Sequence, residues 1–173
     1  MKANAKKETI YANIIMLAVF FFAFLGTEYL FDNCMMYVTD ASGVVRAQNQ
    51  MLGVSAIGFL LYNWISGFLA DKSPWVTGGT GLLAFGVGAG CMGCIILHAG
   101  YVQMMIAGGV LFFLLGVLGA GVHYRMAYSV YDRAMLARCV GFAYAGGIFL
   151  QFLNNNMIHE NHTQAVALCA GAG

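Results

Sequence analysis

The residues best suited to chemistry are two acids, Glu28 and Asp32, which lie in and directly after a long apolar stretch. They are four residues apart, so on a helix they share one face. Neighbouring carboxylates repel each other, so one of them holds a proton more tightly, and an acid at membrane depth indicates proton coupling or cation binding. The alternative is that Asp32 lies in the outer headgroup region and is hydrated. We expect Glu28 to matter more, because it lies deeper in the apolar run.

A second group of polar side chains consists of amides. Gln151 and Asn154 lie near the end of one apolar run, and Asn63 lies within another. Amides can line a solute cavity, but they can also mark the wet end of a helix or join two helices by hydrogen bonds. The candidate substrate or ion-coupling residues are therefore Glu28, Asp32, Asn63, Gln151 and Asn154.

The cysteines predict no disulfide framework, since there are five of them and most lie in or beside apolar runs. A thiol in such a place behaves as a small hydrophobe. Cys91 and Cys94 have the spacing of a redox or metal motif, but no second pair accompanies them. We favour packing over an intramembrane thiol enzyme, and we expect no metal, no cofactor and no enzymatic activity.

The composition of the chain indicates whether it lies in water or in a lipid bilayer. Of 173 residues, 61% are hydrophobic and 9% are charged, against roughly 25% charged in an average soluble domain. The charges are clustered and leave long uncharged stretches, as a bilayer requires. The first apolar run, from 10 to 31, is too long for a signal peptide core. The sequence therefore predicts an all-α integral membrane protein. The three N-terminal lysines directly precede this run and are explained as a topology signal of a membrane span. They therefore do not indicate nucleic-acid binding, and we exclude nucleic acid as a partner.

The uncharged stretches predict the number of membrane spans, because about 20 residues cross roughly 30 Å of hydrocarbon. Residues 73–124 contain 52 uncharged residues, which make two spans divided by the polar break at 98–103. We predict a single transmembrane helical domain over 1–173, with full spans at 10–31, 47–70, 75–97, 103–124 and 139–153 and a partial sixth at 163–173. The last would reach only about 16 Å as a helix, so we expect a fragment truncated in its sixth helix.

Two further patterns concern orientation and packing. With a cytoplasmic N-terminus, seven basic residues lie inside and only Arg46 lies outside, as the positive-inside rule requires. We therefore predict a multi-pass protein of the inner (plasma) membrane. Glycines are concentrated in the third and fourth predicted spans, and the Gly86 and Gly90 spacing predicts close helix packing.

The segment between the second and third predicted spans reads Gly67-Phe-Leu-Ala-Asp-Lys72. Here the chain resembles the major facilitator superfamily, whose members have a Gly-x-Leu-Ala-Asp-Arg/Lys motif in this loop. The superfamily motif continues with a glycine and a basic pair, but this chain has Pro74, Trp75 and Val76 instead. Since the motif is part of the cytoplasmic gate in the superfamily, the resemblance implies a gating role for Gly67, Asp71 and Lys72.

Residues 138–156 also look like the corresponding part of bacterial permeases of this type. The resemblance implies half of a secondary transporter, which moves a small solute by alternating access, and the acid pair indicates coupling to protons or another cation. Two six-helix halves then rock about a midplane site, so the expected partners are the bilayer, the solute and a second half, in the same polypeptide or in a dimer. The alternative is a transporter-like membrane sensor that feeds a signalling domain.

Overall fold

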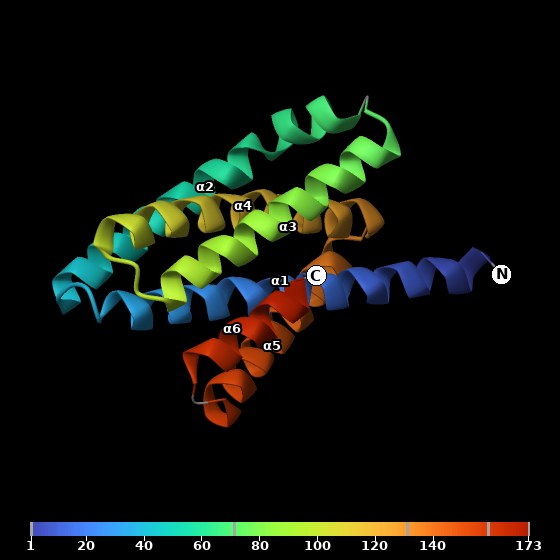
Figure 1. Cartoon of the computed structure of the whole chain (residues 1–173). Coiled ribbons are helices and arrows are strands. Elements are labelled where there is room, and N and C mark those ends of the chain that lie inside the picture. Colours follow the sequence, from blue (N-terminus) through green and yellow to red (C-terminus); the bar gives the residue numbers. More distant parts are fainter. Residues whose placement is uncertain (1, 71, 131, 159, 173) are drawn as a thin grey trace. The chain divides into compact units, whose positions relative to one another are not determined.

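The protein is helical throughout the part that its computed structural model describes, which comprises residues 2–70, 72–130, 132–158 and 160–172. No strand occurs among these residues. Figure 1 shows the helices, which are α1 (Lys2–Met35), α2 (Ala41–Ala70), α3 (Pro74–Ile96), α4 (Tyr101–Ser129), α5 (Arg133–Met157) and α6 (Asn161–Ala172). The all-α prediction is confirmed.

Five of these helices are long and apolar enough to cross a membrane, as predicted. The candidate spans are Glu8–Met35, Ala41–Leu69, Thr77–Ile96, Tyr101–Ser129 and Arg133–Met157. Large apolar side chains are exposed along them, such as Leu60 (78%), Trp64 (81%) and Leu82 (76%), and such exposure suits contact with lipid. The chain is therefore a multi-pass membrane protein. Helix α6 has 12 residues and is not among the candidate spans.

Several helices begin earlier than the apolar runs predicted. Helix α5 begins at Arg133, whereas the predicted span began at 139, because Asp132 caps the helix: its side chain accepts a hydrogen bond from the Ala134 N–H at 3.0 Å. A side-chain cap satisfies backbone donors and so fixes where a helix starts. Charged residues in the first turns mark the edge of the apolar segment, but the helix itself begins earlier, at its cap.

Asp40 has the same role at the start of α2, outside the apolar spans. Its Oδ1 accepts a hydrogen bond from the Gly43 N–H at 2.9 Å, and its Oδ2 accepts one from the Ser42 hydroxyl at 2.9 Å. The Gly43 N–H, followed by the Ser42 hydroxyl, lowers the pKa of Asp40 below its ordinary value. The cap therefore stabilises α2 above the unfolded-state pKa, and this contribution is lost as the pH falls through the folded-state pKa.

The polar break predicted after the third span is a tight turn between α3 and α4. His98 has a φ of 49° and Gly100 a φ of 114°, and both values lie in the region that favours glycine. The His98 ring lies against Tyr37, with ring centroids 4.4 Å apart. The turn therefore joins two helices that each cross the membrane.

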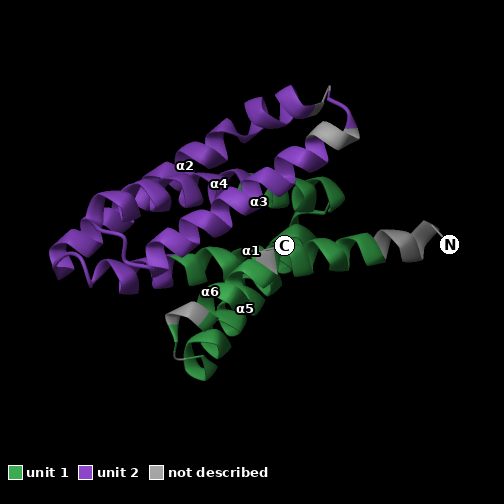
Figure 2. Ribbon diagram, in the orientation of Figure 1, with its two compact units in different colours: residues 1–27, 119–172 green, residues 28–118, 173 purple. Residues whose placement is uncertain are grey.

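The chain forms two compact units, shown in Figure 2. The first unit comprises residues 1–27 and 119–172, and so contains α5, α6 and parts of α1 and α4. The second unit comprises residues 28–118, with α2, α3 and the remaining parts of α1 and α4. The single domain expected over 1–173 stays a prediction.

The core of the first unit is aromatic and aliphatic. Phe20 and Phe21 of α1 contact the His123 ring edge-on, at centroid distances of 5.9 and 5.7 Å. Asn13, buried on α1, donates a hydrogen bond to the Ser129 hydroxyl of α4 at 2.6 Å. Because hydrocarbon offers no competing partners, such a bond holds α1 and α4 together.

The second unit contains a close helix crossing between α2 and α4. A Cβ atom added to Gly116 would overlap the carbonyl oxygen of Ser55, and one added to Gly58 would overlap the carbonyl oxygen of Phe113. By contrast, a Cβ at Gly86 or Gly90 would meet nothing within 4 Å in the described part of the chain. The close packing predicted at Gly86 and Gly90 is therefore not found there, and the two backbones that approach each other belong to α2 and α4.

Candidate functional site

The acid pair lies on α1 in the second unit. Glu28 is half-buried, and its Oε1 accepts a hydrogen bond of 2.7 Å from the Nε2 of Gln48 on α2. Only residues 36–40 separate α1 from α2, so the short connection brings Gln48 back beside Glu28. A hydrogen bond to a carboxylate at membrane depth orients it and offsets part of its desolvation.

Asp32, one helical turn further along α1, has a different environment. Its Oδ1 is buried and has no hydrogen-bond partner among the described residues. This oxygen is shielded by the protein, but the side chain as a whole is only half-buried, so the hydrated role of Asp32 stays an alternative. A buried acceptor without a partner is costly, so a proton or a cation held there would be stabilised. Because they are four residues apart on α1, Glu28 and Asp32 share one face, as predicted.

The amides Gln151 and Asn154 lie together on α5 in the first unit, where they are only 8% and 6% exposed. Gln151 Nε2 donates a hydrogen bond to Asn155 Oδ1 at 2.9 Å. Gln151 Oε1 and both polar atoms of the Asn154 side chain are buried and have no hydrogen-bond partner among the described residues. These two side chains are therefore buried, although they lie within two turns of the end of α5 at Met157.

The surroundings of Gln151 come from α1 and α6. A Cβ added to Gly26 would lie 2.8 Å from Gln151 Oε1 and would also overlap the Leu168 side chain. On α6, Gln164 is 5% exposed, but its Nε2 donates a hydrogen bond of 2.7 Å to the Ile158 carbonyl oxygen. The glycine at position 26 thus leaves room for the unpaired amide oxygen.

These amides offer both donors and acceptors to a ligand. Each buried polar group without a partner costs about 1 to 3 kcal/mol, and polar groups kept at membrane depth at such a cost are functional candidates. Their chemistry suits an uncharged or zwitterionic solute with hydroxyl or amide groups, since such groups donate and accept.

The remaining predicted residues are not brought to either cluster. Asn63 is exposed on α2. Gly67 is also exposed, and a Cβ added there would meet nothing within 4 Å among the described residues. The Lys72 N–H donates to the Leu69 carbonyl oxygen at 3.1 Å, and the Lys72 ammonium lies 4.9 Å from the centre of the Phe68 ring. The motif therefore turns the chain directly after α2, while Asp71 lies outside the described residues.

Two further polar residues of these clusters, Gln48 and Gln164, were not predicted from the sequence. Both stand next to other polar residues, Arg46, Asn49 and Gln50 around Gln48 and Asn161, His162 and Thr163 before Gln164, so no signal in the sequence distinguishes them from their neighbours. Cys91 is half-buried, and Cys94 is exposed, so the structure gives this pair no common buried site.

Comparisons with known proteins identified no relative of this chain. No protein-family model matches the chain, and comparison with curated proteins and with solved structures gave no match.

Proposed function

We propose that this chain is the N-terminal half of a secondary transporter of the major facilitator type, which moves a small polar solute by alternating access and is coupled to protons or another cation. The observation that carries the proposal is the acid pair on α1, with Glu28 hydrogen-bonded by Gln48 and with a buried, unpaired oxygen on Asp32. Acids kept inside membrane helices commonly belong to proton or ion pathways.

The acid pair has the parts that ion coupling requires. Releasing and rebinding a cation needs an anionic group that is reachable in one state and shielded in another. Gln48 reaches Glu28 from a different helix, so a movement of α2 against α1 would break the 2.7 Å hydrogen bond and change the environment of the carboxylate. Such a two-state contact lets ion binding bias the conformation.

The buried amides supply the solute side of the proposal. Gln151 and Asn154 face the interior of the first unit, which also contains Gly26 of α1 and Leu168 of α6. Hydrogen bonds to a polar solute would satisfy atoms that are unpaired in the present state. Solute binding would therefore recover free energy that the empty protein lacks.

The gate is proposed from the motif at 67–72, with Gly67, Asp71 and Lys72 at the end of α2. The superfamily resemblance and the location between two candidate spans support this role. Five of the six described helices are candidate spans, one fewer than the six spans of one half of such a transporter, and α6 would have to belong to the sixth. The basic residues favour a cytoplasmic N-terminus in the plasma membrane, and the partner is a second six-helix half.

Solute uptake tests this function. Proteoliposomes that contain the complete transporter are given an inward proton gradient and a mixture of isotope-labelled sugars, amino acids and organic acids. We expect at least one polar solute to accumulate, and a protonophore to abolish the accumulation. No uptake above protein-free vesicles would contradict transport, and equal uptake by this chain without a second half would contradict the half-transporter assignment.

Replacing Asn154 by leucine is expected to leave the protein as stable as before, or more stable, while uptake is lost. Leucine has a similar shape and removes two unpaired polar atoms, whose burial costs about 1 to 3 kcal/mol. The same change removes the donor and acceptor proposed for the solute. Thermal unfolding in detergent and uptake in proteoliposomes are measured side by side.

The matched control is Asn156→Leu on the same helix. Asn156 is exposed, and the one hydrogen bond of its side chain among the described residues goes to the Phe152 carbonyl oxygen. We expect this variant to keep uptake. Normal uptake in Asn154→Leu, or a loss of stability greater than in the control, would assign Asn154 to packing and not to the solute.

A further inference from the structure

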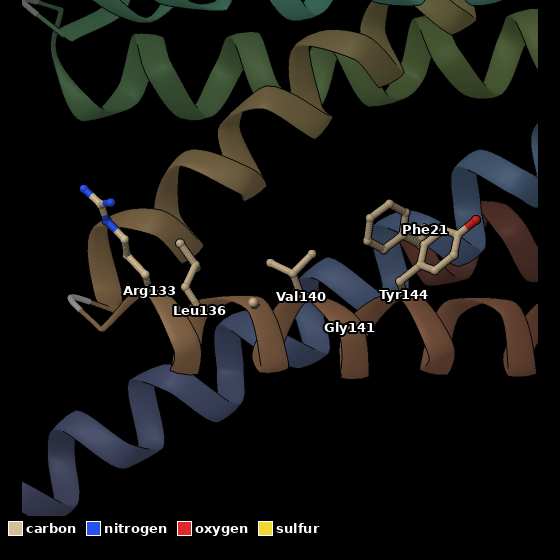
Figure 3. A pocket seen from close by; sticks show the side chains of 7 residues that line it. Phe21, Arg133, Leu136, Val140, Gly141 and Tyr144 are labelled. Atoms are coloured by element: carbon tan, nitrogen blue, oxygen red, sulfur yellow. The ribbon is translucent and has the colours of Figure 1, made fainter.

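A groove of about 610 Å³ runs along α5 in the first unit, and its lining contains none of the polar residues of the two clusters described above. Figure 3 shows its lining, with Arg133 at one end, Leu136 and Val140 in the middle, and Phe21 and Tyr144 at the other end. The Phe21 and Tyr144 rings meet edge-on, with centroids 4.9 Å apart. The groove is thus apolar along its length and has a single cationic group at one end.

The groove follows one face of α5 from the membrane surface inward. Positions 133, 136, 140 and 144 recur at three- and four-residue intervals, so they follow one face of α5. Arg138 marks the edge of the hydrocarbon, so Val140 and Tyr144 lie within it, whereas Arg133 lies about 8 Å further out along the helix. An acyl chain of a lipid whose headgroup is at Arg133 would therefore lie along the inner part of the groove, at Val140 and Tyr144.

Arg133 occupies the place where a lipid headgroup would be. It is the first residue of the candidate span Arg133–Met157, so it lies at a membrane surface whichever side faces the cytoplasm. Its side chain is exposed, and no hydrogen bond or ion pair of its guanidinium occurs among the described residues. A guanidinium is the side chain best suited to bind a phosphate through two parallel hydrogen bonds.

Gly141 keeps the middle of the groove open. It lines the groove, and a Cβ added there would meet nothing within 4 Å. A larger side chain at this position would occupy the space of an acyl chain without disturbing the packing of the helices. The groove can therefore be filled by mutation while its charge is retained.

We propose that this groove binds one anionic phospholipid, with its phosphate at Arg133 and its acyl chain along Val140 and Tyr144. Charge complementarity selects this occupant. An apolar helix of a partner protein would fill the groove but would leave the guanidinium without an anion. A neutral lipid would gain the apolar contact, but it would lack the net negative charge that adds to the attraction at Arg133.

Quenching by brominated lipids tests the proposal in the full chain. A reporter variant carries Tyr144→Trp, with Trp64 and Trp75 replaced by phenylalanine. It is reconstituted in phosphatidylcholine vesicles that contain a minor fraction of brominated phosphatidylglycerol or brominated phosphatidylcholine. We expect the anionic lipid to occupy the groove about fivefold more readily than the neutral one, as expected for one basic residue near an anionic lipid.

Variants separate charge from shape. Arg133→Gln should abolish the preference for the anionic lipid. Arg133→Lys keeps the charge and should retain most of the preference, which would show that the site tolerates substitution. Arg138→Gln removes the same charge from the same helix outside the groove lining, and it should leave the preference unchanged. Gly141→Leu should lower quenching by both lipids.

Three outcomes would overturn the proposal. Equal quenching by the two lipids in the reporter variant would show that the groove does not select charge. An unchanged preference in Arg133→Gln would show that this residue does not hold the phosphate. Quenching by neither lipid would show that protein, such as a second copy of the chain, covers the groove.

Discussion

Replacing Gly116 by alanine is expected to destabilise the second unit by about 1 to 3 kcal/mol, because the added methyl group overfills a packed helix contact. The nearest atoms are backbone atoms of α2, namely the carbonyl group of Ser55 and, at 3.1 Å, the nitrogen of Phe59. Backbone cannot rotate away as a side chain can, so the two helices must separate. Gly58→Ala should act in the same way against the Phe113 carbonyl group.

Gly109→Ala on the same helix is the matched control. A Cβ at Gly109 would meet nothing within 4 Å, and alanine favours the helix over glycine by up to about 1 kcal/mol. We therefore expect Gly109→Ala to be neutral or stabilising. The measurement is thermal unfolding in detergent, followed by circular dichroism. A midpoint for Gly116→Ala equal to that of Gly109→Ala would contradict the close crossing of α2 and α4.

The number and place of the membrane helices could be predicted from the sequence, because bilayer thickness converts uncharged stretches directly into spans. The helix ends could not be predicted in this way. They depend on caps such as Asp40 and Asp132, which are local hydrogen-bonded structures outside the apolar runs. A charged residue reports the edge of the hydrocarbon, whereas the cap reports the start of the helix.

The candidate site was only partly predictable for a related reason. Glu28 and Asp32 share a face because of helical periodicity, which is a local property. Gln48, the hydrogen-bond donor to Glu28, belongs to another helix, so only the tertiary structure brings it there. The same holds for glycine: a spacing pattern pointed to Gly86 and Gly90, while contacts with a neighbouring backbone occur at Gly58, Gly116 and Gly147.

Glu28→Gln is expected to have the largest effect on the proposed function, because it removes the proton-binding group while retaining its size and most of its hydrogen bonds. Gln48 can still approach the side chain at position 28, so the fold and solute binding should persist. Uptake should then stop when inside and outside concentrations are equal. Asp32→Asn should also impair accumulation, since the Oδ1 of Asp32 is buried beside Glu28 on the same face.

Glu8→Gln provides the matched control for this substitution. Glu8 is an exposed acid at the start of the same apolar span, so the change in charge and in residue type is identical. The control should accumulate solute as the original protein does. Any general effect of removing an acid from α1 would appear in both variants, and only an effect specific to Glu28 bears on coupling.

Proton-driven accumulation in proteoliposomes, measured together with solute exchange in the absence of a gradient, tests the central claim most directly. If this chain is half of an ion-coupled transporter, Glu28→Gln will exchange solute across the membrane but will not accumulate it under a proton gradient, while Glu8→Gln will do both. Full proton-driven accumulation by Glu28→Gln would contradict the account, since Glu28 would then be an interfacial charge without a part in coupling.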